Sequence, residues 1–182
     1  MLRIGKTLLA VALVAALGGC EAGVRKDAAK GAERLFAAVV ARDRVAFEAA
    51  VDRRAVREDL RGQLIEVARE QGLEVDGGPS EFALDRMIGP EAFRLVDERG
   101  ERLAQAPNAE QIAGMIEVQD RQRACVQDKA ERCLLTFAKQ KAEDGPQWRL
   151  VGMVANDLII RVPETDTPGV TARRAQGQSP EG

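Results

Sequence analysis

Apolar residues recur every three or four positions through most of the chain and give way to a two-residue alternation near Glu117. The first period is typical of amphipathic helices, and the second is typical of strands with one buried face. The N-terminal part is therefore predicted to be helical and the C-terminal part to form a sheet. The fold class that follows is α+β, with helices packed on an antiparallel meander of three or four strands.

The first three predicted helices follow one another with short breaks. A helix over 31–42 carries an apolar face, and Asp43 and Asp52 are then placed to cap a short second helix and a longer third one. The third helix is expected to end at Gly72. The apolar positions assigned to these helices are Leu35, Phe36, Val39, Val40, Val45, Phe47, Ala50, Val51, Val56, Leu60, Leu64 and Val67.

Three more helical segments are predicted before the sheet. Ser80 is placed to cap the first, with Phe82 and Leu84 on its apolar face. A helical pattern resumes through 93–103. Asn108, with Gln three residues later, resembles a capping box and introduces a last short helix.

Strands are predicted over 121–127, 132–139, 147–155 and 158–162. Turn residues separate the first three, which gives an antiparallel meander, and the last segment is its possible fourth strand. Alternation places Trp148 and Leu150 on one face of the third strand, and the helices are expected to cover that face.

The N-terminus has the order of a secretory leader. Arg3 and Lys6 precede an apolar run over 8–17, which is followed by the sequence Leu-Gly-Gly-Cys ending at Cys20. The run is shorter than the roughly 20 residues that a spanning helix needs. The Leu-Gly-Gly-Cys sequence resembles the lipobox of bacterial lipoproteins. The resemblance implies a cleaved signal peptide over 1–19 and acyl chains on Cys20.

This resemblance also implies a location and a domain plan. The protein is expected in the cell envelope, held on a membrane through Cys20 and facing the periplasm. Asp at the place of Glu21 favours inner-membrane retention, and Glu there leaves the choice of membrane open; the outer membrane is preferred to the inner one. Residues 20–30 are expected to form a tether and 31–162 a single domain, and the apolar-poor segment 163–182 is expected to be a disordered tail.

Composition narrows the range of functions. The 182 residues carry a formal charge of −2 and contain no His and no Tyr. Nucleic acid is therefore an unexpected partner, because the basic residues are also interspersed with acidic ones. The lack of His removes the commonest general base and metal ligand. We assign no catalytic residue, no metal site and no cofactor.

Cys125 and Cys133 are predicted to form a disulfide. An envelope compartment permits disulfides, and lipidation of Cys20 leaves an even number of cysteines. If the turn between the first two strands is centred on Lys129, the two cysteines lie directly opposite each other. The alternatives are two reduced cysteines that pack separately and, less in keeping with a Cys-x7-Cys spacing that lacks His, a redox or metal pair.

A second resemblance covers roughly residues 28–160. The runs 35–43, 47–52 and 55–64, with a strand pair that closes on Trp148, resemble the bacterial family called domain of unknown function 2939. That family has no assigned activity, so the resemblance implies no catalytic residues. The predicted arrangement is also similar to nuclear-transport-factor-2-like and cystatin-related folds, a likeness that concerns the fold alone.

The function predicted from these patterns is a non-enzymatic binding or structural module anchored in the envelope. Its partner would be an unidentified protein or an apolar small molecule. The alternative is a carboxylate-dependent hydrolase or isomerase on a nuclear-transport-factor-2-like fold, which would need a carboxylate with a raised pKa in an apolar pocket. The acids available for such a role include Asp97, Glu98, Glu117, Asp120 and Asp157.

Overall fold

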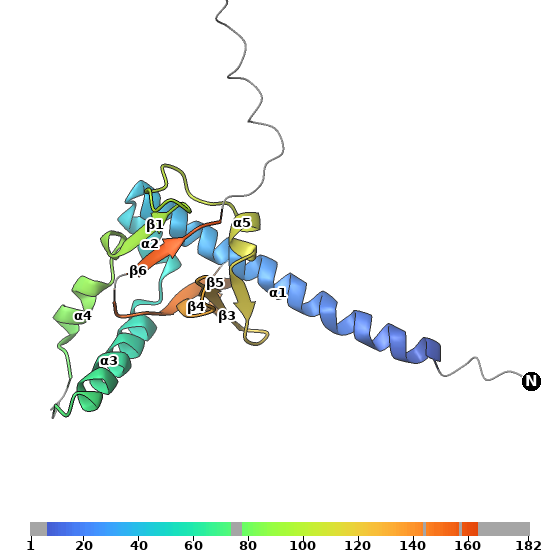
Figure 1. Cartoon of the computed structure of the whole chain (residues 1–182), viewed down its shortest axis with the longest axis horizontal. Helices are drawn as coiled ribbons and strands as arrows, with labels where there is room; N and C mark the ends of the chain where they lie inside the picture. The colour runs from blue at the N-terminus through green and yellow to red at the C-terminus, as the bar shows by residue number, and fades with distance from the viewer. Residues whose placement is uncertain (1–6, 74–77, 144, 157, 164–182) are drawn as a thin grey trace, which may run out of the picture.

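The computed structural model describes residues 7–73, 78–143, 145–156 and 158–163, with side chains from residue 21 onward. Figure 1 shows a long first helix, a group of shorter helices at one side and a sheet between them. The helical elements are α1 (Thr7–Ala41), α2 (Arg44–Ala50), α3 (Arg53–Glu70), α4 (Glu81–Met87), a 3-10 turn η1 (Pro90–Ala92) and α5 (Ala109–Ala113). The strands are β1 (Phe93–Val96), β2 (Ile116–Val118), β3 (Arg123–Gln127), β4 (Cys133–Ala142), β5 (Gly145–Met153) and β6 (Leu158–Arg161).

Strands β2, β3, β4 and β5 form an antiparallel meander in chain order. This confirms the predicted α+β class. The fourth strand of the meander is β2, which precedes the four segments predicted to be strands. The proposed fourth strand, β6, instead lies outside this sheet.

Strands β1 and β6 make a separate two-stranded parallel sheet in which Phe93 is paired with Leu158. The helix predicted over 93–103 is therefore wrong. A short apolar run is compatible with a helix or a buried strand, and here the partner strand lies more than sixty residues further along the chain. After β1 the chain turns back, and the N–H of Leu103 donates to the carbonyl of Leu95 at 3.0 Å.

Helix α1 crosses the meander, and its first half projects beyond the domain (Figure 1). Residues 21–30, predicted to be a tether, are helical, and Ala28 and Ala29 are fully buried. The tether prediction is wrong because these small residues let the helix approach the sheet closely. A Cβ built on Gly31 would stand 2.5 Å from the Cβ of Trp148 on β5.

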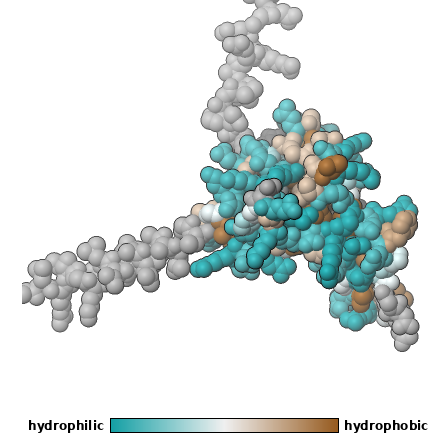
Figure 2. All heavy atoms as spheres, turned by 180° about the vertical axis from the view of Figure 1, so that it is seen from behind, coloured by the Kyte–Doolittle hydropathy of each residue, from teal (hydrophilic) through white to brown (hydrophobic). Residues whose placement is uncertain are grey.

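Several apolar residues predicted to face the core are instead exposed. Val45 on α2 is 82% exposed and Phe82 on α4 is 73% exposed, and Val67 near the end of α3 is 44% exposed. Figure 2 shows a mostly hydrophilic surface with a few separate apolar areas, some of them near the tip where α3 and α4 lie and another at the top of the domain. Both α2 and α4 are only seven residues long, and they bury few side chains: Phe47 and Ala50 in α2, and Leu84 in α4.

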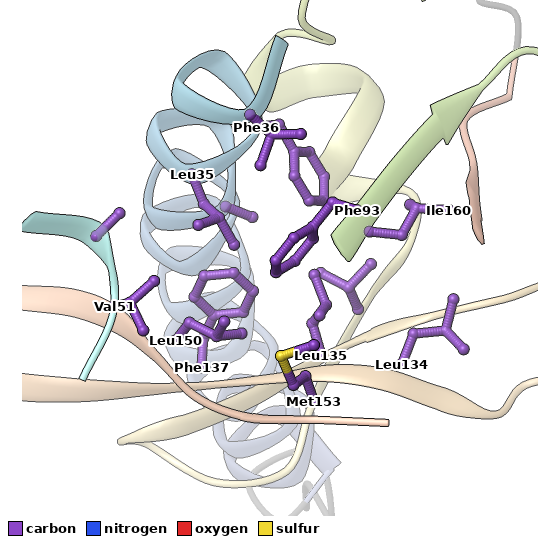
Figure 3. Close-up of a cluster of buried hydrophobic side chains, with 14 of the residues drawn as sticks. Leu35, Phe36, Val51, Phe93, Leu134, Leu135, Phe137, Leu150, Met153 and Ile160 are labelled. Carbon is purple, nitrogen blue, oxygen red and sulfur yellow. The ribbon is translucent and has the colours of Figure 1, made fainter. Parts of the chain in front are cut away.

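The core lies between α1, the meander and the β1–β6 pair. Figure 3 shows Leu35 and Phe36 of α1 pointing toward Phe93 and Ile160 on one side and toward Leu150 on the other. The rings of Phe47 and Phe93 meet edge to face, with centroids 5.6 Å apart. With Phe137 and Leu135 from β4, these buried side chains join the three parts of the fold into one apolar cluster.

The predicted helix caps are confirmed. The side chains of Asp43, Asp52 and Ser80 accept from the N–H groups of the residues three positions later. Asn108 and Gln111 form a complete capping box. Each cap satisfies a donor that the first turn of its helix leaves unpaired.

Helix α3 covers the outer edge of β5. The N–H of Asp52 donates to the carbonyl of Leu150 at 2.8 Å, and Asp59 accepts from the N–H of Met153 at 3.0 Å. Gln63 continues this pairing further along the strand. The edge of the meander is thus paired with side chains instead of being left open to another strand.

Within the described residues, no helix combines the length and apolarity required to cross a bilayer. The predicted signal peptide falls partly on residues 1–6, and the predicted tail falls almost entirely on 164–182; both stretches lie outside the described residues.

Candidate functional site

The predicted disulfide is present: Cys125 and Cys133 are bonded, with their Cα atoms 5.6 Å apart. The two residues are not directly opposite, because Cys125 is paired with Thr136 and Gln127 with Cys133. An irregularity in register between Val126 and Gln127 shifts the strands relative to the turn. The bridge is therefore diagonal and closes the β3–β4 hairpin.

Cys20, the predicted lipidation site, lies within the backbone of α1. Its side chain is outside the described part of the structure. Ala28, eight residues later, is already in the core. At 1.5 Å per helical residue, about 12 Å separates the two positions along the helix axis.

An apolar groove runs between α1 and α2. It has a volume of about 420 Å³, which falls in the range of small-molecule sites. Alanine side chains line most of the groove, and the remaining lining residues are Arg34, Asp43 and Gln147. The alanines are Ala37, Ala38, Ala41, Ala46, Ala49 and Ala50.

A basic hollow of about 350 Å³ adjoins the apolar groove. Three cations line it: Lys30 and Arg34 from α1 and Lys139 from β4. Its one acidic residue, Asp27, is 3.8 Å from the amino group of Lys30. The two hollows share Arg34 and Gln147, and therefore form one continuous surface with an apolar part and a cationic part.

Trp148 lines the basic hollow and is 4% exposed. Its indole N–H has no hydrogen-bond partner among the described residues. Its backbone carbonyl accepts from the Arg34 guanidinium at 3.3 Å. A buried N–H without a partner is uncommon in folded proteins, and this one is enclosed by the protein and not presented to the hollow.

A third hollow, of about 540 Å³, lies among α2, α3 and α4. Most of its charged residues are already paired, Arg86 being the exception among the described residues that line it. Arg53 forms ion pairs with Glu48 and Asp85 and donates to the carbonyl of Ile88 at 3.1 Å. Arg44 is 2.8 Å from Glu91. The hydrogen bond to Glu48 raises the pKa of Arg53 above its ordinary value. These contacts hold the three helices together, so this hollow is a weaker candidate than the first two.

None of the described carboxylates has the environment that the enzymatic alternative requires. Among the described residues, no charged side chain is buried, and no group of three or more His, Cys, Asp or Glu could hold a metal ion. Partial burial acts to raise the pKa of Asp52, but hydrogen bonds from Gln140 and the Ala55 N–H outweigh it and leave that pKa lowered. A general acid poised in an apolar pocket would need the opposite shift.

The described acids among those considered from the sequence accept hydrogen bonds in turns or form pairs at the surface. Asp97 accepts from two backbone N–H groups in the loop after β1, and Asp120 does the same before β3. Glu98 is 3.2 Å from Lys129, and Glu117 accepts from Gln127. Asp157 is outside the described residues.

None of the family models, curated proteins or solved structures compared with the chain matches it. Membership of the domain of unknown function 2939 family stays a prediction.

The sequence did not predict the groove or the basic hollow. Their residues come from α1, α2, β4 and the start of β5, and only the tertiary fold brings these together. The one available signal was the density of alanine at 37–50. On an exposed helix face, alanine leaves room that a larger side chain would fill.

Proposed function

We propose that the protein is an envelope lipoprotein whose domain binds an amphiphile with an anionic head group, without catalysis. The observation that carries this proposal is the continuity of the alanine-lined groove with the basic hollow through Arg34 and Gln147. One part suits an apolar chain and the adjoining part suits an acidic group.

The apolar part supports the proposal through its wall. Alanine methyl groups offer apolar area without filling the space between α1 and α2, and burial of a ligand's methylene groups there contributes about 0.8 kcal/mol each. Asp43 at one side is already engaged, since its carboxylate accepts from the N–H of Ala46.

The basic part supports an anionic head. Lys30, Arg34 and Lys139 supply three positive charges against the single carboxylate of Asp27. An acid group placed there would accept charge-assisted hydrogen bonds, which are stronger than neutral ones.

The location is part of the same proposal. The lipobox resemblance at Cys20 supports an acyl anchor, and the Cys125–Cys133 bridge is of the kind that forms in oxidising compartments. A bilayer surface is also where amphiphiles are abundant.

Trp148 is the only tryptophan of the chain, so its fluorescence reports on the basic hollow directly. We expect dodecanoate to change this fluorescence saturably in full-length protein held in phosphatidylcholine nanodiscs, with empty discs subtracted. Arg34→Gln and Lys139→Gln should each weaken binding by about tenfold, through loss of a charge-assisted contact. Dodecanol and dodecyltrimethylammonium, which share the chain but lack the negative head, should bind more weakly.

A matched pair of substitutions tests the groove. Ala46→Leu should obstruct it and reduce binding, whereas Ala83→Leu adds the same bulk to an exposed position of α4 away from the groove. Equal affinity in both variants and in the unsubstituted protein would refute the groove as the site of the chain. Equal binding of the three dodecyl probes would refute the anionic head.

A further inference from the structure

A small hollow of about 190 Å³ lies where the end of α1 meets β1 and the chain returning from it. Arg42, Arg94 and Arg102 line this hollow. We propose that these three arginines form a binding site for a phosphate-type oxyanion, separate from the alanine groove. Only the choice between a soluble ligand and a membrane head group rests on the anchor at Cys20 that belongs to the proposed function.

The composition of the wall is the first argument. Besides the three arginines it contains only apolar residues, and no carboxylate takes part: Val39, Val40, Phe93, Leu95 and Leu103. Three distinct elements of the fold supply the arginines. Arg42 follows α1, Arg94 is within β1, and Arg102 is paired with Val96 on the returning segment.

The second argument is that these guanidinium groups lack partners. Among the described residues, none of the three makes a side-chain hydrogen bond or an ion pair, although Arg44, Arg53 and Arg57 nearby in the chain all do. The acid near Arg42 is Glu91, whose carboxylate is taken by Arg44 at 2.8 Å. All three arginines are exposed, so solvent and salt screen the repulsion between them, and their attraction for an anion is strongest at low ionic strength.

The third argument is the backbone at Arg42. The residue has φ 54°, in the left-handed region. Its N–H donates to the carbonyl of Val39, and the next N–H, of Asp43, donates to Ala38. This is the Schellman ending of a helix, in which the left-handed position is usually glycine because a Cβ is disfavoured there. Among the described residues, Arg42 and Glu131 are the two non-glycine residues with positive φ; at Arg42 this conformation coincides with the hollow lined by the three arginines, and strained positions of this kind cluster at functional sites.

A simpler explanation is that the arginines offset the negative end of the α1 dipole. The dipole favours cations at the last turn of the helix, and of the three arginines only Arg42 lies there. It does not account for Arg94 and Arg102, which come from elements outside the helix. The two explanations differ in what the arginines bind, which experiment can decide.

The size and chemistry of the hollow indicate the ligand class. The volume is below that of drug-sized sites and is suited to a small ion or to one group of a larger molecule. Guanidinium forks match the oxygen geometry of phosphate through paired hydrogen bonds. Arg42 lies twenty-two residues after Cys20, or about 30 Å along the helix, so a soluble phosphate or phosphomonoester is favoured over a head group of the anchoring membrane.

The test uses full-length protein in phosphatidylcholine nanodiscs at low ionic strength, with melting temperature and calorimetric titration as readouts. Inorganic phosphate and glycerol phosphate should raise the melting temperature in a saturable way, and NaCl at matched ionic strength should not. Arg94→Gln and Arg102→Gln should each lower the phosphate affinity by about tenfold. Arg99→Gln, in the same loop but outside the wall of the hollow, is the matched control and should leave the affinity unchanged.

Arg42→Gly separates binding from folding. It should raise the melting temperature in the absence of phosphate by about 3 °C, because glycine relieves the left-handed backbone, while the response to phosphate is lost. A response equal in all variants, or no response of the unsubstituted protein to tens of millimolar phosphate, would overturn the proposal. Stronger binding to nanodiscs containing phosphatidylglycerol than to glycerol phosphate would overturn the assignment to a soluble ligand.

Discussion

Gln63 of α3 is hydrogen-bonded to Met153 at the edge of β5 in the manner of a neighbouring strand. Its side-chain amide donates to the Met153 carbonyl at 2.8 Å, and its carbonyl oxygen accepts from the N–H of Ala155 at 3.1 Å. One side chain thereby satisfies two backbone groups that would otherwise lie open at a sheet edge.

The first prediction follows from this contact. Gln63→Leu should lower the free energy of unfolding by about 2 to 4 kcal/mol, because two partly buried backbone groups lose their partners. Gln71→Leu, at the exposed end of the same helix, is the control and should change it by less than about 0.5 kcal/mol. Denaturant titration of both variants provides the comparison, and equal midpoints would contradict the role given to Gln63.

The second prediction concerns the contact of α1 with β5. Gly31→Ala adds a methyl group only 2.5 Å from the Cβ of Trp148. The overpacking should destabilise the fold by about 1 to 3 kcal/mol. Gly62→Ala on α3 meets nothing within 4 Å and should stabilise it by about 0.5 to 1 kcal/mol, because alanine is the better helix former. Thermal unfolding that moved in the same direction for both variants would be evidence against this packing.

The third prediction is the contribution of the disulfide. The Cys125–Cys133 bridge spans a sequence separation of 8, and a loop of that length contributes about 2 to 3 kcal/mol in the chain-entropy model. The Cys125→Ala, Cys133→Ala double variant should lose that amount in denaturant unfolding. Mass spectrometry of envelope protein alkylated on extraction should detect no free thiol at these positions; free thiols at both would show that the bridge does not form in the cell.

The fourth prediction concerns pH. The folded-state pKa of Asp52 lies below its usual 3.8, since the hydrogen bonds from Gln140 and Ala55 outweigh the effect of burial. The stability due to this group is therefore fully present above pH 3.8 and is lost as the pH falls through the lower folded-state value. Asp52→Asn should reduce the stability at neutral pH and flatten its decline on acidification, as measured by urea unfolding between pH 6 and about pH 2.5. An unchanged slope would exclude Asp52 as a contributor.

The fifth prediction tests the anchor. Cys20→Ser removes the thiol that the lipobox resemblance assigns to acylation, so incorporation of labelled palmitate should stop and the protein should leave the membrane fraction. Cys125→Ser, which leaves Cys20 intact, is the control for incorporation. Continued labelling of the Cys20→Ser variant would reject the assignment.

The sequence predicted those features of the fold that depend on neighbouring residues. The caps at Asp43, Asp52 and Ser80 each rest on a hydrogen bond across three residues, which local sequence specifies. The meander was predictable because each hairpin consists of neighbouring segments, in which apolar and polar residues alternate and turn residues separate the strands.

Features that depend on distant residues were missed. Strand β1 was predicted to be helical because its parallel partner, β6, is far along the chain. The cysteines were placed directly opposite each other because a register irregularity cannot be read from spacing. Arg42, Arg94 and Arg102 looked like ordinary solvated charges, and only the fold brings them to one hollow.

The uninterrupted path of α1 from Cys20 to the core bears on how an anchored domain would move. A flexible linker would let the domain swing in any direction, whereas a continuous helix transmits any tilt at the bilayer surface unchanged to the sheet. The alanine groove begins about 25 Å along that helix from Cys20, so its height above the bilayer would change only when the whole helix tilts. Fluorescence anisotropy of a dye on the domain would then report slow whole-body wobble in place of fast local tumbling.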